Sequence, residues 1–146
     1  MFQKSVLLCS LIIAAVALQG CVMSSTPFQA QQALSDEALV YLYRPESLIS
    51  RGIHFSAILN DKESIGPLIN NAYIPIHAKP GALKVVLQKN SFPKSTLDTT
   101  VYDNLESGKI YYLKANPGLF GAYTLVKMET AVGKAEVSST SYYQSK

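Results

Sequence analysis

The sequence of 146 residues has no tryptophan, two cysteines, two histidines and only 16% charged residues. Its 13 basic and 10 acidic side chains give a formal net charge of +3, and the basic ones do not cluster along the chain. Binding of DNA or RNA through phosphate contacts requires a stronger and more concentrated excess of Lys and Arg. We therefore expect no nucleic-acid partner.

Hydrophobic residues, in contrast, make up 48% of the chain, which excludes wholesale disorder. At about 100–150 residues per domain, the length allows one domain with short tails. Much of the hydrophobic excess lies in the first twenty residues, and this segment has to be set aside before the fold is predicted.

The N-terminus has the pattern of a secretory signal. Lys4 supplies a positive charge, and residues 6–18 are apolar apart from Ser10. A helix of this length spans about 20 Å, which is less than the roughly 30 Å hydrocarbon core of a bilayer. We expect a signal peptide over residues 1–20 and no membrane-spanning anchor.

Residues 18–21, Leu-Gln-Gly-Cys, resemble the lipobox of bacterial lipoproteins. In such proteins the cysteine sulfur receives a diacylglyceryl group, and cleavage then leaves this cysteine as the acylated first residue. The resemblance implies that Cys21 carries an N-acyl chain, such as palmitate, and an S-diacylglycerol. Several acyl chains, each stabilising insertion by about 0.8 kcal/mol per buried methylene, would make anchoring permanent.

A second cleavage site is left open. Ala15-Val16-Ala17 fits the small-residue pattern of an ordinary secretory signal, and cleavage after Ala17 would release a soluble protein, for example a secreted inhibitor. Cys21 would then be its only thiol. An unpaired exposed cysteine is unfavourable in an oxidising compartment, so the lipoprotein interpretation is favoured.

Two neighbouring features extend the lipoprotein hypothesis. Val22 follows the cysteine, whereas Asp at this position is the usual mark of inner-membrane retention in Gram-negative lipoproteins; the resemblance thus implies the outer membrane, with the domain facing the periplasm. Cys9, the other cysteine, lies within the apolar segment and is lost on processing. No thiol then remains for a disulfide, a zinc cluster or a nucleophile.

After Cys21, residues 21–37 are rich in Ser, Thr, Pro and Gln, and they predict a flexible tether of about 20–24 Å. From residue 38 onward the hydrophobic period changes to two, most clearly over residues 53–60. Turn sequences at 60–62, 79–81 and 106–109 separate the short strands.

The sequence therefore predicts an all-β domain over residues 38–137, an antiparallel two-sheet β-sandwich of seven or eight short strands. Residues 130–137 fit either a final helical turn or an edge strand. The polar tail, residues 138–146, is expected to be frayed or loosely docked.

Five short motifs are spread over this domain. They are Tyr-Leu-Tyr-Arg-Pro at 41–45, Asn-Asp at 60–61, Pro-Gly at 80–81, Gly-Lys-Ile-Tyr-Tyr-Leu at 108–113 and Gly-Leu-Phe-Gly at 118–121. In this pattern the domain resembles the domain-of-unknown-function 2846 family of small bacterial lipoproteins, although Lys62 stands where the hairpin of that family has glycine. The resemblance implies a fold and an envelope location, but no activity.

Nothing in the sequence indicates catalysis. His54 and His77 are expected on different strands without further ligands, so no metal site is predicted. No nucleophile elbow and no phosphate-binding loop is present. Asp98 and Asp103 would face opposite sides of one strand, which makes them a poor acid–base pair. We expect no cofactor and no enzyme activity; the alternative is a small-ligand carrier or an enzyme whose site converges on Arg51, His77 or Asp98.

The candidates for partner contacts are therefore aromatic. Phe120 lies in a glycine loop, where its favoured role is to plug the end of the sandwich and its second role is to meet a partner. Because loops often carry binding sites, it ranks first among the contact candidates. Tyr41, Tyr43 and Arg44 are weaker candidates, since strand tyrosines usually cap a sheet with the ring packed. The prediction is a lipid-anchored accessory or structural module that binds an envelope protein.

Overall fold

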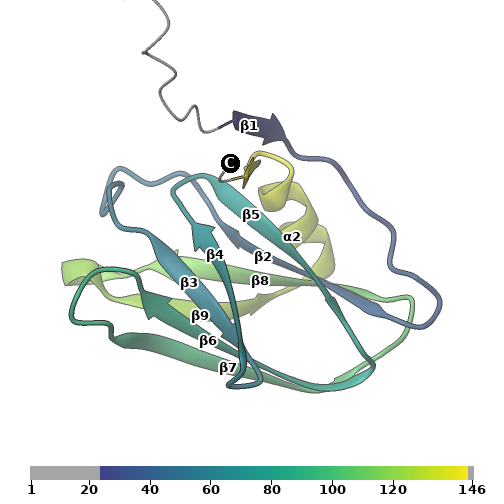
Figure 1. The fold of residues 1–146 in the computed structure, drawn as a ribbon. Coiled ribbons are helices and arrows are strands. Elements are labelled where there is room, and N and C mark those ends of the chain that lie inside the picture. The colour runs from purple at the N-terminus through teal and green to yellow at the C-terminus, as the bar shows by residue number, and fades with distance from the viewer. Residues whose placement is uncertain (1–23, 145–146) are drawn as a thin grey trace, which may run out of the picture.

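The structure is a computed structural model that describes residues 24–144. The predicted signal peptide and the predicted acylation site, Cys21, lie outside the described residues. The described chain forms two β-sheets that pack against each other (Figure 1). The all-β sandwich predicted from the hydrophobic pattern is therefore confirmed.

One sheet has six strands and the other has four. In spatial order, the six are β1 (Ser24–Pro27), β10 (Ser141–Gln144), β5 (Ala72–Ala78), β2 (Ala38–Arg44), β8 (Ile110–Pro117) and β9 (Tyr123–Met128). The four are β4 (Glu63–Leu68), β3 (Phe55–Leu59), β6 (Gly81–Lys89) and β7 (Thr96–Leu105). A single turn of 3-10 helix, η1 (Leu119–Gly121), and helix α2 (Thr130–Val137) complete the described elements.

Two details of the strands differ from the prediction. The described residues contain ten strands instead of seven or eight, because the four-residue strands β1 and β10 are too short for a detectable alternation. Two pairings are also parallel, that of β2 with β8 and that of β10 with β5. Between β2 and β8 the chain enters the four-stranded sheet twice, as β3–β4 and as β6–β7, and returns in between to the larger sheet as β5, antiparallel to β2. Parallel strands such as β2 and β8 need a long connection of this kind.

The turn after β3 shows how the chain manages without the hairpin glycine. Asn60 and Asp61 both have positive φ, at 49° and 58°, as a tight type I′ turn requires. The backbone N–H of Lys62 donates to the carbonyl of Leu59 at 3.0 Å. Asn and Asp tolerate the left-handed region better than other residues with a side chain, so Lys62 does not disturb the turn.

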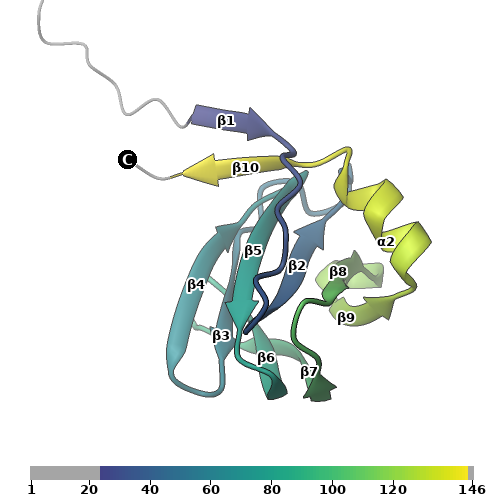
Figure 2. The same ribbon diagram turned by 90° about the vertical axis from the view of Figure 1, so that its right-hand side faces the viewer.

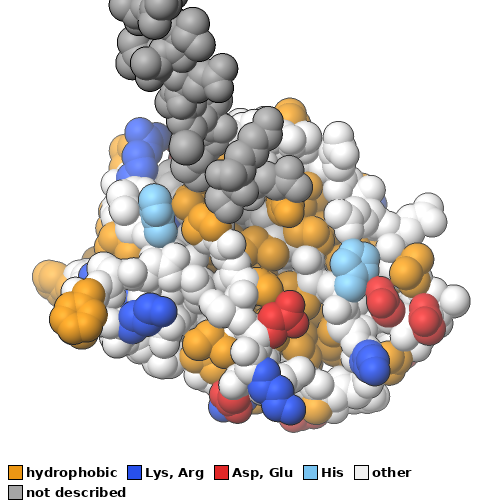
Figure 3. Space-filling model, viewed as in Figure 1, with side chains coloured by type: hydrophobic (Ala, Val, Ile, Leu, Met, Phe, Trp, Pro, Cys, Tyr) orange, Lys and Arg blue, Asp and Glu red, His pale blue; other side chains and the backbone are white. Residues whose placement is uncertain are grey.

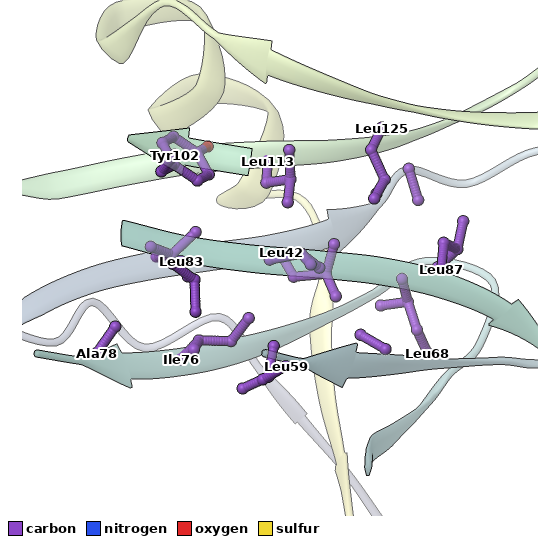
Figure 4. Packing of buried hydrophobic residues seen from close by; sticks show 14 of the residues in the cluster. Leu42, Leu59, Leu68, Ile76, Ala78, Leu83, Leu87, Tyr102, Leu113 and Leu125 are labelled. Carbon is purple, nitrogen blue, oxygen red and sulfur yellow. The ribbon is translucent and has the colours of Figure 1, made fainter. Parts of the chain in front are cut away.

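The main core lies between the two sheets. Leu42 of β2 packs there with Leu113 of β8 and with Leu83 and Leu87 of β6 (Figure 4). All seven residues of β2 are buried. This agrees with its apolar residues on both faces, a pattern typical of a central strand that is covered on two sides.

A second apolar cluster covers the other face of β2. Tyr41 stacks on Tyr112 of β8 with 5.8 Å between ring centroids, and Phe28 meets Tyr41 edge-on at 5.4 Å. Helix α2 covers this face with Val137, so residues 130–137 are a helix and not an edge strand. The helix lies very close to β8 at Gly133, where an added Cβ would overlap the Tyr112 side chain.

The expected tether and tail are corrected where the structure describes them. Ser24–Pro27 pairs antiparallel with Ser141–Gln144 at the edge of the larger sheet (Figure 2). Phe28 and Tyr142 pack against Tyr73, with centroids at 5.0 and 5.7 Å. Each terminal segment finds its partner in the other, far away in sequence, and a local pattern cannot predict such a pairing.

Candidate functional site: the loop end of the sandwich

Three connections that carry exposed apolar side chains meet at one end of the sandwich, which we call the loop end, beside the short turn at 69–71 between β4 and β5. They are residues 45–54 between β2 and β3, residues 90–95 between β6 and β7, and residues 118–122 between β8 and β9. Figure 1 shows them together on the left side of the molecule.

The strand registers explain why these connections meet. Phe55 pairs with Lys89, so β3 begins where β6 ends. Because β2 and β8 run parallel, their last residues, Arg44 and Pro117, point toward the same end. A direct contact between Arg44 and Phe55 then joins the ends of the two sheets.

Arg44 is the residue that holds the longest of these loops. Its two terminal nitrogens donate to the carbonyls of Ile53 and Ser50 at 2.5 and 2.7 Å. Its guanidinium lies over the rings of Phe55 and Tyr123, at 4.9 and 5.2 Å from the centroids. No carboxylate of a described residue pairs with it. Burial lowers the pKa of Arg44, but a guanidinium keeps its proton in proteins.

Burial corrects three of the predicted partner contacts. Tyr41, Tyr43 and Arg44 are each no more than 1% exposed, so they have no surface to offer a partner in this fold. The tyrosines are covered by α2 and by the segment that follows β1, and Arg44 by the loop that it binds. Arg44 therefore positions the loop end instead of contacting a partner.

Phe120 does not have the role that the sequence favoured, that of a plug for the end of the sandwich. It is fully exposed, and the preceding Leu119 is 75% exposed. Two backbone hydrogen bonds close the loop: Gly118 N–H donates to the carbonyl of Ala122 at 2.8 Å, and Ala122 N–H donates to the carbonyl of Leu119 at 3.1 Å.

The backbone of Phe120 is in the left-handed region, with φ 55° and ψ 30°. This conformation is unfavourable for a bulky side chain and costs of order 1–3 kcal/mol. The ring makes no compensating contact in the core, because it is fully exposed. A strained residue with an exposed apolar ring is a candidate for binding and not for stability.

The other two loops also present large apolar side chains to solvent. Phe92 is fully exposed, Leu48 is 84% exposed, and Ile49 is more than half exposed. The loop end therefore carries five of the nine exposed large hydrophobic residues that are found among the described residues. Such gathering on one end is not expected of scattered surface residues.

A hollow of about 400 Å³ lies between the first two loops. It is lined by Gly52, Ile53, His54, Lys89, Asn90 and Ser91. Asn90 is fixed there, since its N–H donates to the carbonyl of His54 at 3.1 Å and its side-chain oxygen accepts from the Ser56 hydroxyl at 2.6 Å. The amide NH₂ of Asn90 is left to donate elsewhere.

The charged residues of the loop end are mostly cationic. Arg51, Lys89 and Lys94 accompany a single acidic residue, Glu46. Glu46 pairs with Arg51 at 2.8 Å, whereas Lys89 and Lys94 form no ion pair with any described residue. In Figure 3, hydrophobic and basic groups lie at the left margin without an acidic group, whereas the centre and the lower and right margins hold acidic and basic groups together.

The residues predicted for a carrier or an enzyme site do not converge. Arg51 is at the loop end, and the His77 ring is bound at the opposite end by Glu37 and Gln31, at 3.1 and 2.9 Å. Asp98 ties β7 to β9 by accepting from the N–H of Leu125 at 2.6 Å. No group of three or more metal-ligating side chains occurs among residues 24–144.

Comparisons with protein-family models, with curated proteins and with solved structures found no match to the chain. The family resemblance of residues 38–137 therefore stays a prediction. None of the helices within the described part of the chain is long and apolar enough to cross a membrane.

Of the exposed apolar residues at the loop end, sequence reasoning singled out only Phe120. Leu48 and Ile49 form an apolar pair between serines, and Phe92 lies between Ser91 and Pro93; nothing local distinguishes them from buried loop residues. The signal that would have helped is the strand register, because it brings the ends of β2, β6 and β8 together.

Proposed function

We propose that the protein is a lipid-anchored module of the bacterial cell envelope, acylated at Cys21, which acts by binding through its loop end and not by catalysis. The observation that carries the binding role is the gathering of five exposed apolar side chains on three loops. Large exposed apolar surface marks interaction sites in soluble domains.

The anchor is supported by the lipobox-like residues 18–21, and Val22 favours the outer membrane with the domain in the periplasm. The folded domain begins at Ser24, only three residues after Cys21. Three residues span at most about 11 Å, so a domain anchored there would sit against the headgroups instead of being held away from them. An envelope protein as a further partner stays a prediction.

The anchor is tested by the mass of the N-terminal peptide of the protein purified from membranes. We expect a peptide that begins at Cys21 and carries a diacylglyceryl group and an N-acyl chain, and we expect the Cys21→Ser variant to lack both. An unmodified peptide that begins at Leu18 would instead establish cleavage after Ala17 and a secreted soluble protein.

The binding role is tested by photo-crosslinking in cells. A photoreactive amino acid is placed at Phe120 or at Phe92 and, as a control, at Leu34, which is also exposed but lies at the other end of the sandwich. We expect crosslinked products from the two loop positions and few from position 34. Equal products from both ends would contradict a binding site at the loop end.

A further inference from the structure

We infer that the loop end docks on the surface of an anionic phospholipid bilayer, with the apolar loop tips in the interface and a headgroup phosphate in the hollow between the first two loops. The inference takes its site from the proposed function and specifies what that site binds.

The chemistry of the loop tips favours lipid over a protein partner. Protein–protein interfaces are enriched in Tyr, Trp, Phe, Met and Arg and depleted in Lys. The exposed rings of Phe92 and Phe120 suit either occupant. The three loops contain no Tyr or Trp, however, and Lys89 and Lys94 lie beside the tips without an ion pair in the described chain. The tyrosines Tyr41, Tyr43 and Tyr123 are buried instead of being presented.

The shape of the loop end also favours a bilayer. The apolar residues stand on three separate loops with a polar hollow between two of them. Each of these protrusions can enter a fluid interface by itself. Phe and Leu are the side chains that amphipathic elements insert at the boundary between headgroups and acyl chains.

Charge complementarity identifies the lipid as anionic. Lys89 and Lys94 have no ion pair within the described chain, and Arg51 shares only the exposed carboxylate of Glu46. Basic side chains beside an inserted apolar segment are attracted to the negative potential of anionic headgroups. At the opposite end, the connections hold both the acidic residues Asp36, Glu37, Asp61 and Glu106 and the basic residues Lys62, Lys79 and Lys109. The opposite end therefore has no excess of basic residues.

The hollow supplies donors for one phosphate. Lys89, Asn90 and Ser91 line it, and their side chains carry an ammonium, an amide and a hydroxyl. Ammonium and neutral N–H or O–H donors together are suited to phosphate oxygens, and the charged donor forms the stronger bond. Arg44, buried directly beneath the loop, fixes the carbonyls of Ser50 and Ile53 and so holds one wall of the hollow in place.

The position of β1 is compatible with this orientation. Pro27 pairs with Ser141, Ser141 pairs with Ala72, and Ala72 pairs with Arg44 at the loop end. Cys21 lies three residues before Ser24, the first residue of β1, and three residues span at most about 11 Å. An acylated Cys21 would therefore hold the β1 edge of the larger sheet close to the bilayer, and the loop tips would enter the same surface beside it; this arrangement alone depends on the proposed acylation.

The test uses the processed protein purified from membranes, with a single environment-sensitive fluorophore on Phe120→Cys, Phe92→Cys or the control Leu34→Cys. Each protein is incorporated into vesicles of phosphatidylcholine with phosphatidylglycerol, with and without lipids that carry a nitroxide quencher near the headgroup. We expect quenching at positions 92 and 120 to exceed quenching at position 34 at least threefold. Equal quenching at all three positions would overturn the inference.

A second set of variants distinguishes binding of an anionic headgroup from insertion of the apolar tips alone. Lys89→Gln with Lys94→Gln should lower tip quenching in vesicles that contain phosphatidylglycerol to the level found in pure phosphatidylcholine. As a control, Lys62→Gln with Lys109→Gln, at the opposite end, should leave it unchanged. Equal quenching in both kinds of vesicle with the native lysines would contradict an anionic headgroup site.

The mass of the N-terminal peptide of the same samples keeps the two proposals apart. If Cys21 is acylated but the tips are not quenched, docking is wrong and the anchor stands. If Cys21 is unmodified but the tips are quenched when vesicles are added, docking stands and the anchor is wrong. Crosslinks from position 120 to a protein, without quenching, would replace the bilayer by a protein partner.

Discussion

Arg44 at the end of β2 places its guanidinium 4.9 Å from the centroid of the Phe55 ring at the start of β3. The two residues belong to different sheets. In the loop between them, the carbonyls of Ser50 and Ile53 accept hydrogen bonds from the same guanidinium. A buried cation thus takes the place of a hydrophobic plug at the loop end. Its charge is stabilised by carbonyl dipoles and aromatic faces, where a carboxylate would otherwise be expected.

Replacement of this cation should loosen the loop and the domain together. Arg44→Lys keeps the charge but cannot span both carbonyls and stack on the rings, because an ammonium is not a planar fork. We expect a loss of about 2–3 kcal/mol in the free energy of unfolding, since hydrogen bonds to charged groups contribute about 1.5–3 kcal/mol. Denaturant unfolding measures it. Arg51→Lys, in an exposed ion pair, is the control and should change stability by less than about 0.5 kcal/mol.

Substitution of Phe120 should improve stability while it weakens binding. Phe120→Asn places in the left-handed region a residue that tolerates it, so we expect thermal unfolding to show a gain of about 0.5–1 kcal/mol. The tip quenching in vesicles should fall in the same protein. Leu119→Asn removes a similar exposed apolar side chain without positive φ, so it should weaken binding with no gain in stability. A destabilised Phe120→Asn protein would show that the ring packs somewhere.

The contact between α2 and β8 leaves no room at Gly133. In Gly133→Ala the new methyl group would overlap Cβ and Cγ of Tyr112, both close to the backbone of β8. We expect a loss of about 1–3 kcal/mol as the helix shifts, typical of overpacking. Gly52→Ala is a matched control, because no atom lies within 4 Å of its new Cβ. Equal stability of the two variants would contradict the packing described for α2.

The carboxylate of Glu136 also holds helix α2 in place, and its contribution to stability should depend on pH. Glu136 accepts from Tyr43 at 2.6 Å and from Lys114 at 2.8 Å. Burial opposes the charged form, but these two partners outweigh it and lower the pKa of Glu136 below 4.5. A depressed pKa in the folded state contributes stability above the unfolded pKa and loses it as pH falls through the folded value.

We therefore expect native stability to decline more steeply below pH 4.5 than that of Glu136→Gln, which has no carboxyl to protonate. Urea unfolding at a series of pH values between 3 and 7 measures the difference. The exposed pair of Lys84 and Asp61 offers a control, because Asp61→Asn should leave the slope nearly unchanged. If the stability of the native protein and that of Glu136→Gln depend on pH in the same way, the predicted contribution of Glu136 is wrong.

Alkaline pH should act on the tyrosines of the second apolar cluster. Burial, followed by the neighbouring Glu136, raises the pKa of Tyr43 well above 10, and burial also raises the pKa of Tyr41 and Tyr112. A raised pKa means that stability is complete below pH 10 and declines as pH rises above it. Unfolding between pH 8 and 11 should show this decline, and Tyr43→Phe should make it shallower. Constant stability up to pH 11 would contradict a role of these tyrosines in the loss of stability.

The sequence determined the parts of this protein that depend on near neighbours. The alternation from Phe55 to Leu59 predicted β3, and Asn60-Asp61 predicted the turn that follows, because side-chain direction and φ preference are properties of a few consecutive residues. The glycines at 118 and 121 likewise placed Phe120 in a loop, although the favoured role was a plug for the sandwich and the ring is in fact exposed. These features together were enough for an all-β sandwich.

Only the tertiary structure decided which faces of the strands are buried, how the terminal segments pair and which loops lie together. The two faces of β2 are both buried because α2 and the segment after β1 cover one of them, so Tyr41, Tyr43 and Arg44 became structural residues. Ser24–Pro27 became a strand because Ser141–Gln144 lies beside it. The loop end exists because parallel and antiparallel registers bring three distant loops together, and pairing between distant segments leaves no trace in a local pattern.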